Sequence, residues 1–194
     1  MIAVRRARAA DAAAIGTVHV AAWRSAYPGI LPDTYLANLS VPRQAAYYDA
    51  AIRGSTGVFV AVASGADAPP AGSGTENRPR IIGFATAGRS RTGSDIGRRL
   101  GEGEIETLYV LDDWRERGVG RRLMQATAAH LAEAGCRSVY LWVLRENPSR
   151  WFYERLGGKP AAEAAIRFAG RSVMQTAFVW DPIERLLAAS PQES

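Results

Sequence analysis

The spacing of apolar and polar residues along the chain predicts a series of strands and helices. Runs of β-branched and apolar residues of strand length, such as 57–63 and 81–87, indicate strands. Apolar residues at helical spacing after Asp11 indicate a helix that Asp11 would cap. The predicted elements, in order, are a strand at 2–6, a helix from Asp11 to Pro28-Gly29, a short helix from Pro32-Asp33, a helix at 43–53, strands at 57–63, 81–87 and 104–111, a helix at 121–135, a strand at 137–144, a helix at about 148–156, strands at 161–169 and 172–180, and a short helix at 182–189.

These elements predict one domain of mixed α/β structure over residues 1–194. A chain of 194 residues is long enough to bury a substantial core. Residues 64–79 are dense in Gly, Pro, Ala and Ser, which predicts a mobile hairpin loop rather than a domain boundary. Residues 190–194 are expected to form a loose tail.

The composition is typical of a globular protein, with 47% hydrophobic and 22% charged residues, and no apolar run is long enough to cross a bilayer. The single Cys136 cannot form an internal disulfide, so we expect a cytoplasmic location and a small buried thiol. The net charge of +5 comes almost entirely from arginine. Charge alone is weak evidence for nucleic-acid binding, and the chain has no recognisable nucleic-acid module, so no such partner is predicted.

The segment 115–120, Arg-Glu-Arg-Gly-Val-Gly, lies between a predicted strand and a predicted helix. A strand that enters a helix through glycines presents unpaired backbone N–H groups at the positive end of the helix dipole. The glycines let an anion approach the backbone, and Arg115, Arg117, Arg121 and Arg122 add positive charge. The segment lacks the Gly-Lys-Ser/Thr of a P-loop and the third Gly or Ala of a dinucleotide fingerprint. It therefore predicts a diphosphate-binding turn of another kind.

The pattern Arg-x-x-Gly-x-Gly after a Leu-Tyr-Val strand resembles the acetyl-coenzyme A motif of the GNAT acyltransferase superfamily. Residues 141–158 resemble the family's strand–Asn–helix segment, and residues 22–32 resemble the helix–loop–helix entry of one bacterial branch. The three segments occur in the family's order. The resemblance implies the GNAT acyl-CoA N-acyltransferase fold, with a central, mostly antiparallel, twisted sheet of about seven strands that is flanked by helices and open between its fourth and fifth strands.

The resemblance also implies that the chain binds acetyl-CoA as a co-substrate. The pantetheine arm would pair with backbone groups around Leu108 and Val110, and the Val110 N–H would face the thioester oxygen. Asn147 matches a pantetheine-binding residue, and its place before a helix makes capping the alternative role. The implied cofactor-binding residues are Leu108, Tyr109, Val110, Arg115, Glu116, Arg117, Gly118, Val119, Gly120, Arg121, Arg122, Asn147 and Tyr153.

Two carboxylates are candidates for the base that accepts the proton of the attacking amine. Glu104 and Glu106 point to the same side of their predicted strand. Counted back from Arg115, Glu104 matches the base of the histone-acetylating branch, whereas Glu106 would lie closer to the acetyl group. Either could instead be a solvated or salt-bridged side chain, so both stay open and Glu104 is preferred. Tyr153 matches the family's helix tyrosine, which can protonate the leaving thiolate; aromatic packing is its alternative role.

Trp23 and Tyr27 lie in the segment that, by resemblance, lines the acceptor pocket. A residue such as Trp23 at helical spacing equally fits a core position, so Tyr27, at the predicted helix end, is the better candidate. Neither His19 nor His130 belongs to a cluster with metal-ligand spacing, and no metal is predicted.

Taken with these residues, the resemblance implies an N-acetyltransferase that moves the acetyl group of acetyl-CoA to a primary amine by direct attack in a ternary complex. The acceptor is a small molecule or a peptide, whose identity the fold and cofactor site do not determine. The motifs also allow a longer acyl-CoA substrate or a non-catalytic coenzyme-binding sensor. Some members of the family pair through their last strands, so a homodimer is compatible with the resemblance.

Overall fold

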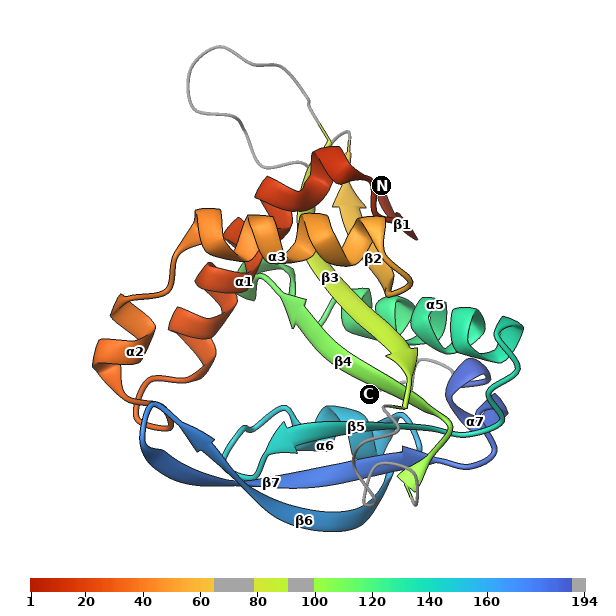
Figure 1. Cartoon of the computed structure of the whole chain (residues 1–194). Helices are drawn as coiled ribbons and strands as arrows, with labels where there is room; N and C mark the ends of the chain where they lie inside the picture. The colour runs from red at the N-terminus through yellow and green to blue at the C-terminus, as the bar shows by residue number, and fades with distance from the viewer. Residues whose placement is uncertain (65–78, 91–99, 190–194) are drawn as a thin grey trace.

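The framework of the molecule is a sheet of seven strands in the order β1-β2-β3-β4-β5-β7-β6 (Figure 1). The computed structural model describes residues 1–64, 79–90 and 100–189, so the predicted loop at 64–79 and tail at 190–194 fall almost wholly outside the described residues. Neighbouring strands are antiparallel except β4 and β5, which are parallel. The predicted sheet is therefore present, with strands β1 (Ile2–Arg6), β2 (Gly57–Ala63), β3 (Arg80–Arg89), β4 (Gly103–Val110), β5 (Val139–Leu144), β6 (Lys159–Phe168) and β7 (Arg171–Trp180).

Helices cover both faces of the first half of the sheet. Two of them, α1 and α3, pack on each other and on one face of β2–β4, and α5 packs on the other face (Figure 1). The helices are α1 (Ala12–Ala26), α2 (Asp33–Ala37), α3 (Val41–Arg53), α5 (Val119–Glu133), α6 (Arg150–Arg155) and α7 (Glu184–Leu187). Across the described ranges, none of them is both long enough and apolar enough to span a membrane.

Asp11 is the N-cap residue of α1, as predicted, but its side chain makes no capping hydrogen bond to that helix. Its carboxylate accepts the Arg8 N–H at 2.7 Å and two hydrogen bonds from the Arg5 guanidinium, at 2.7 and 2.9 Å. A bidentate bond from a guanidinium is stronger than a cap to a neutral N–H. Arg5 therefore holds the carboxylate, lowers its pKa, and ties β1 to the residues before α1.

The strands β4 and β5 pair only where they begin. Within the described residues, their ladder contains two pairs, Gly103 with Val139 and Glu104 with Tyr140. Beyond these pairs the two strands diverge and leave a fork in the sheet (Figure 1). The opening that was predicted between the fourth and fifth strands is this fork.

A bulge in β4 accompanies the fork. Thr107 pairs with Thr86 and Ile105 pairs with Ala87, which leaves Glu106 as an extra residue between them. A bulge bends its strand and increases the local twist. The bend therefore falls two residues beyond the last contact of β4 with β5.

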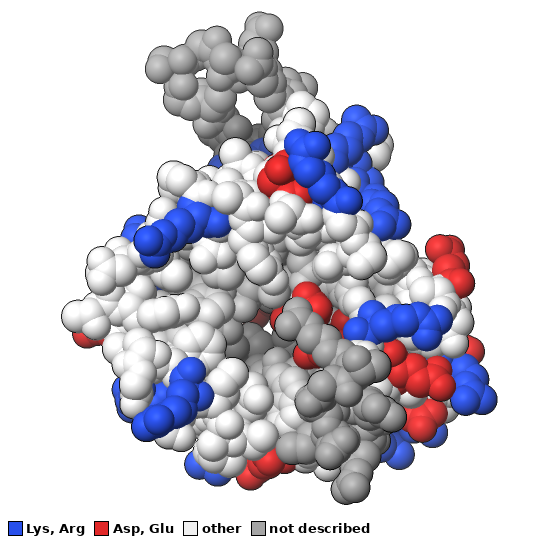
Figure 2. All heavy atoms as spheres, in the orientation of Figure 1, with Lys and Arg blue, Asp and Glu red and all other residues white. Residues whose placement is uncertain are grey.

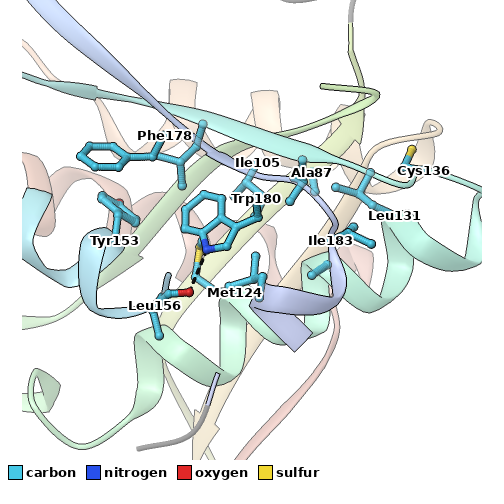
Figure 3. Close-up of a cluster of buried hydrophobic side chains, with 14 of the residues drawn as sticks. Ala87, Ile105, Met124, Leu131, Cys136, Tyr153, Leu156, Phe178, Trp180 and Ile183 are labelled. Atoms are coloured by element: carbon cyan, nitrogen blue, oxygen red, sulfur yellow. Dashed lines mark hydrogen bonds between the residues drawn. The ribbon is translucent and has the colours of Figure 1, made fainter. Parts of the chain in front are cut away.

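The main hydrophobic core joins the second half of the sheet to the helices around it (Figure 3). At its centre Trp180 is fully buried, and its Nε1 donates to the carbonyl oxygen of Leu156 at 2.8 Å. Gly158 passes so close that a Cβ at this position would lie 2.7 Å from the indole ring. This packing fixes α6 against β7. It thereby sets the position of the second arm of the fork, which consists of β5 and α6, whereas β4 is the first arm.

Candidate active site

Along the edge of β4 that faces the fork, the backbone groups beyond Glu104 pair with no other described strand. Just after β4, the Leu111 N–H donates to the Ile82 carbonyl oxygen on β3 at 2.9 Å. Backbone groups alternate in direction along a strand, so those of Leu108 and Val110 point away from β3, toward the fork. Their side chains meanwhile pack in the core against α5. These two residues thus combine a packed side chain with a backbone that can accept an added strand.

The turn before α5 exposes the start of that helix. Gly118 precedes the helix with a φ of +71°, and Glu116 has a φ of +61°, which is unusual for a residue with a side chain. The first N–H of the helix that is hydrogen-bonded to a backbone carbonyl is that of Arg122, which donates to Gly118 at 3.1 Å. The N–H groups before it lie at the positive end of the helix dipole. They form a cradle suited to a diphosphate.

The arginines of the turn are held by neighbouring side chains. Arg115 forms an ion pair with Asp112 at 2.8 Å, and Asp112 also accepts a hydrogen bond from Ser25 on α1. The guanidinium of Arg117 lies over the ring of Trp114, 5.0 Å from its centroid. These contacts fix the turn relative to α1.

The two arginines in the first turn of α5 point to different places. A Cβ added at Gly118 would lie 3.6 Å from the guanidinium of Arg121, which therefore lies beside the cradle. The same guanidinium reaches the carbonyl of Ala189 at 3.5 Å. In contrast, Arg122 donates to the carbonyl of Ile2 on β1 at 3.0 Å. Of the two, Arg121 is the better placed to contact an anion in the cradle.

Gly120 has a packing role that the sequence did not indicate. A Cβ at this position would lie 3.1 Å from the ring of Phe152 on α6. Contact that close would force the ring to move. Gly120 therefore lets α5 and α6 approach each other, besides leaving the helix start open to a ligand.

Both candidate carboxylates lie on one side of β4, at the closed end of the fork. The Tyr140 hydroxyl donates to Oε2 of Glu104 at 2.9 Å and lies 3.3 Å from the Ser90 hydroxyl. Burial, with a smaller contribution from the charges of Glu104 and Glu106, raises the pKa of Tyr140 to about 12. A Cβ added at Gly88, the β3 partner of Glu104, would lie 3.8 Å from Oε1 of Glu106. Sequence reasoning missed Tyr140, because its contact depends on the register between β4 and β5.

Asn147 and Tyr153 lie on the other arm of the fork. The Asn147 Oδ1 accepts the Ser149 N–H at 2.9 Å, which shapes the turn and makes α6 begin at Arg150, two residues later than predicted. Tyr153 is buried in the core beside Phe178 and Trp180 (Figure 3). Burial raises its pKa, so its hydroxyl keeps its proton over the neutral range. The N-cap of α6 is Ser149, without a side-chain cap hydrogen bond, so the alternative that Asn147 caps the helix is wrong. The structure shows the packing role of Tyr153, and the roles of both residues toward a ligand stay predictions.

Aromatic side chains gather at the wide end of the fork. Trp23 has its ring centroid 5.0 Å from that of Tyr27 and 5.9 Å from that of Phe168, at the end of β6. Burial raises the pKa of the Tyr27 hydroxyl, and hydrogen bonding with Tyr109 and Asn147 opposes that rise. Tyr27 thus links α1 with both arms of the fork, whereas Trp23 is mainly a packing residue.

A hollow opens near the centre of this face of the molecule (Figure 2). Acidic side chains lie at its edge, and the surface on the side of α1 and α2 is mostly uncharged. His19 is buried, and its Nδ1 lies 2.8 Å from the Tyr48 hydroxyl. Among the described residues, no group of three or more His, Cys, Asp or Glu side chains could hold a metal ion.

Comparisons with known proteins agree with this geometry. The sequence profile of the acetyltransferase (GNAT) family matches residues 23–158. The uncharacterized N-acetyltransferase YuaI of Bacillus subtilis (strain 168) is 29% identical to this chain over 186 residues, 96% of each protein. The solved structure of yncA, a putative acetyltransferase from Salmonella typhimurium with its cofactor acetyl-CoA, matches with a TM-score of 0.63 and 20% identity over 100% of this chain and 98% of that one. PaiA N-acetyltransferase from Thermoplasma acidophilum, in complex with coenzyme A, matches with a TM-score of 0.61 and 17% identity over 90% of this chain and 98% of that one.

Proposed function

Because this chain belongs to the GNAT family of acetyltransferases, we propose that it transfers the acetyl group of acetyl-CoA to a primary amine of a small molecule or peptide. The amine would attack directly in a ternary complex. The observation that carries the proposal is the alignment of two binding features along one fork, namely the free edge of β4 and the exposed start of α5. A relative of the same fold that binds acetyl-CoA supports the choice of acyl donor.

The residues around the fork fit acetyl-CoA. The first-turn N–H groups of α5 and the Arg121 guanidinium would hold the diphosphate. Backbone groups of Leu108 and Val110 would pair with the amides of the pantetheine arm, as in strand addition. Asn147, which follows β5 on the opposite side of the fork, would also contact the pantetheine.

The chemistry that acetyl-CoA supplies is an activated acetyl group held as a thioester. The Val110 N–H would donate to the thioester oxygen as negative charge develops there. An amine with a pKa near ~10.4 is almost entirely protonated at pH 7, so a base is needed, and Glu104 would accept the proton. Tyr153 would supply a proton to the departing sulfur, because its hydroxyl is still protonated at neutral pH.

The acceptor would enter at the wide end of the fork, past Tyr27 and Trp23. The uncharged surface beside α1 and α2 suits a neutral or apolar body, and the acidic edge of the hollow suits the amine (Figure 2). We also propose a cytoplasmic location, which agrees with the burial of the single thiol, Cys136.

A panel of amine acceptors incubated with acetyl-CoA tests the proposal, with release of free thiol as the readout. Thiol release that depends on one acceptor class would support acetyl transfer. Replacing acetyl-CoA by propionyl-, butyryl- and longer acyl-CoA would reveal a preference for another acyl chain. Tight coenzyme binding in calorimetry, without turnover on any acceptor, would instead identify a non-catalytic sensor.

A further inference from the structure

The contact between Tyr140 and Glu104 lies where the two arms of the fork separate. These residues form the last pair of the β4–β5 ladder, so their side chains meet at the closed end of the opening. The Tyr140 hydroxyl donates to Oε2 of Glu104 at 2.9 Å, and the Ser90 hydroxyl lies 3.3 Å from the same phenol oxygen. The Tyr140 side chain is almost completely buried, with 3% of its surface exposed. Its hydroxyl is therefore held by packing and can orient the carboxylate.

We propose that Tyr140 is a positioning residue, which orients the Glu104 carboxylate toward the acceptor amine and keeps it ionised. This inference rests on the proposed role of Glu104 as the base. A hydrogen bond donated to a carboxylate favours its ionised form.

Among the described residues, three other charged groups lie near this pair, namely Glu106, Glu102 and Arg89. Glu106, on the bulge of β4, is the second carboxylate that acts on the Tyr140 hydroxyl. Glu102, before β4, forms an ion pair with Arg137 at 3.2 Å, and Arg89 at the end of β3 donates to the Ala134 carbonyl. Burial keeps the pKa of Tyr140 at about 12, so its hydroxyl is a donor throughout the pH range of an assay.

The test compares pH profiles of kcat/KM for wild type, Tyr140→Phe, Glu104→Gln and the double variant. The ionisation that disappears in Glu104→Gln belongs to the base. In Tyr140→Phe this ionisation should move up by about one pH unit, as expected when a carboxylate loses one hydrogen bond. On the acid side kcat/KM should fall about tenfold, and at high pH it should approach the wild-type value. Tyr47→Phe, at an exposed position on α3, is the matched control and should leave the profile unchanged.

The variants separate failure of this inference from failure of the proposed function. If Glu104→Gln keeps the full wild-type profile, Glu104 is not the base and both ideas fall. If Glu104→Gln loses the ionisation but Tyr140→Phe leaves it at its wild-type pH, only the positioning role is refuted. If the double variant differs from Glu104→Gln in the pH of any remaining ionisation, the tyrosine acts on a group other than Glu104. Thermal melting of each variant distinguishes a local effect from unfolding.

Discussion

At the scale of single residues, Glu104 has the position expected of a base, because it lies where β4 leaves β5 and where backbone groups begin to face the fork. Glu104→Gln keeps the size of the side chain but cannot accept the proton. We expect kcat near pH 7 to fall about 100-fold, within the range typical of a lost general base. Activity should recover at high pH, where the amine loses its own proton. Steady-state kinetics from pH 6 to 10 would measure both effects.

Two further variants serve as references for that experiment. Glu106→Gln tests the second carboxylate, and recovery at high pH in this variant alone would transfer the role of base to Glu106. Glu102→Gln alters a carboxylate that is paired with Arg137 outside the fork, and it should have little effect on kcat. A wild-type pH profile in Glu104→Gln would exclude Glu104 from the mechanism.

Ala169, in the turn between β6 and β7, is a second residue whose conformation allows a prediction. Its φ is +46°, a left-handed conformation that is strained for a residue with a Cβ. Ala169→Gly should therefore raise the free energy of unfolding by about 1 kcal/mol, measured by urea denaturation. The matched change Ala165→Gly, within β6, should lower it by about 0.5–1 kcal/mol. A loss of stability in both variants would contradict strain in the turn.

At the scale of elements, the start of α5 offers a matched pair of arginines. Arg121 lies beside the Gly118 cradle, whereas Arg122 donates to the carbonyl of Ile2 on β1. Arg121→Gln should weaken acetyl-CoA binding about tenfold, the order expected for one charge-assisted hydrogen bond. Arg122→Gln removes the same charge and should change the affinity much less. Isothermal titration calorimetry measures both, and equal losses would mean that general charge, rather than the cradle, attracts the coenzyme.

The elements also show which features the sequence could predict. The strand–turn–helix at 115–120 was recognisable because glycines and arginines at fixed spacing follow an apolar strand. The roles of Tyr140 and Gly120 were not, since one depends on the register of β4 with β5 and the other on the approach of Phe152. The N-cap position of Asp11 was predictable, but the partner of its side chain was not, because Arg5 lies on a different element. Local patterns therefore predicted the elements, whereas contacts between elements decided what individual side chains do.

At the scale of the whole molecule, the fork is bounded at both ends. Its narrow end is closed by the pairing of Glu104 with Tyr140. At its wide end, Phe168 from β6 meets Trp23 of α1 and Tyr35 of α2, with ring centroids 5.9 and 5.8 Å apart. The two halves of the molecule are thus joined at both ends of the opening, by the β4–β5 ladder at the narrow end and through α1 and α2 at the wide end. This arrangement holds the two arms at a fixed separation, as a site between them requires.

Stability of the whole molecule at acid pH should depend on His19, which lies on the buried face of α1. Burial lowers its pKa from 6.5 to about 4, so the unfolded chain binds a proton between these values and the folded chain does not. The free energy of unfolding should therefore fall as the pH drops from about 6.5 to 4, and this residue alone should account for about 3 kcal/mol. His19→Phe lacks this contribution. As the pH falls, the free energy of unfolding of the wild type should therefore decrease by that amount more than the free energy of unfolding of the variant, which changes the gap between the two. Urea denaturation at pH 7, 5.5 and 4 measures the gap, with His130→Gln, at a less buried ring, as the control for a smaller shift in the same direction. A gap between wild type and His19→Phe that is constant with pH would show that folding leaves the pKa of His19 unchanged.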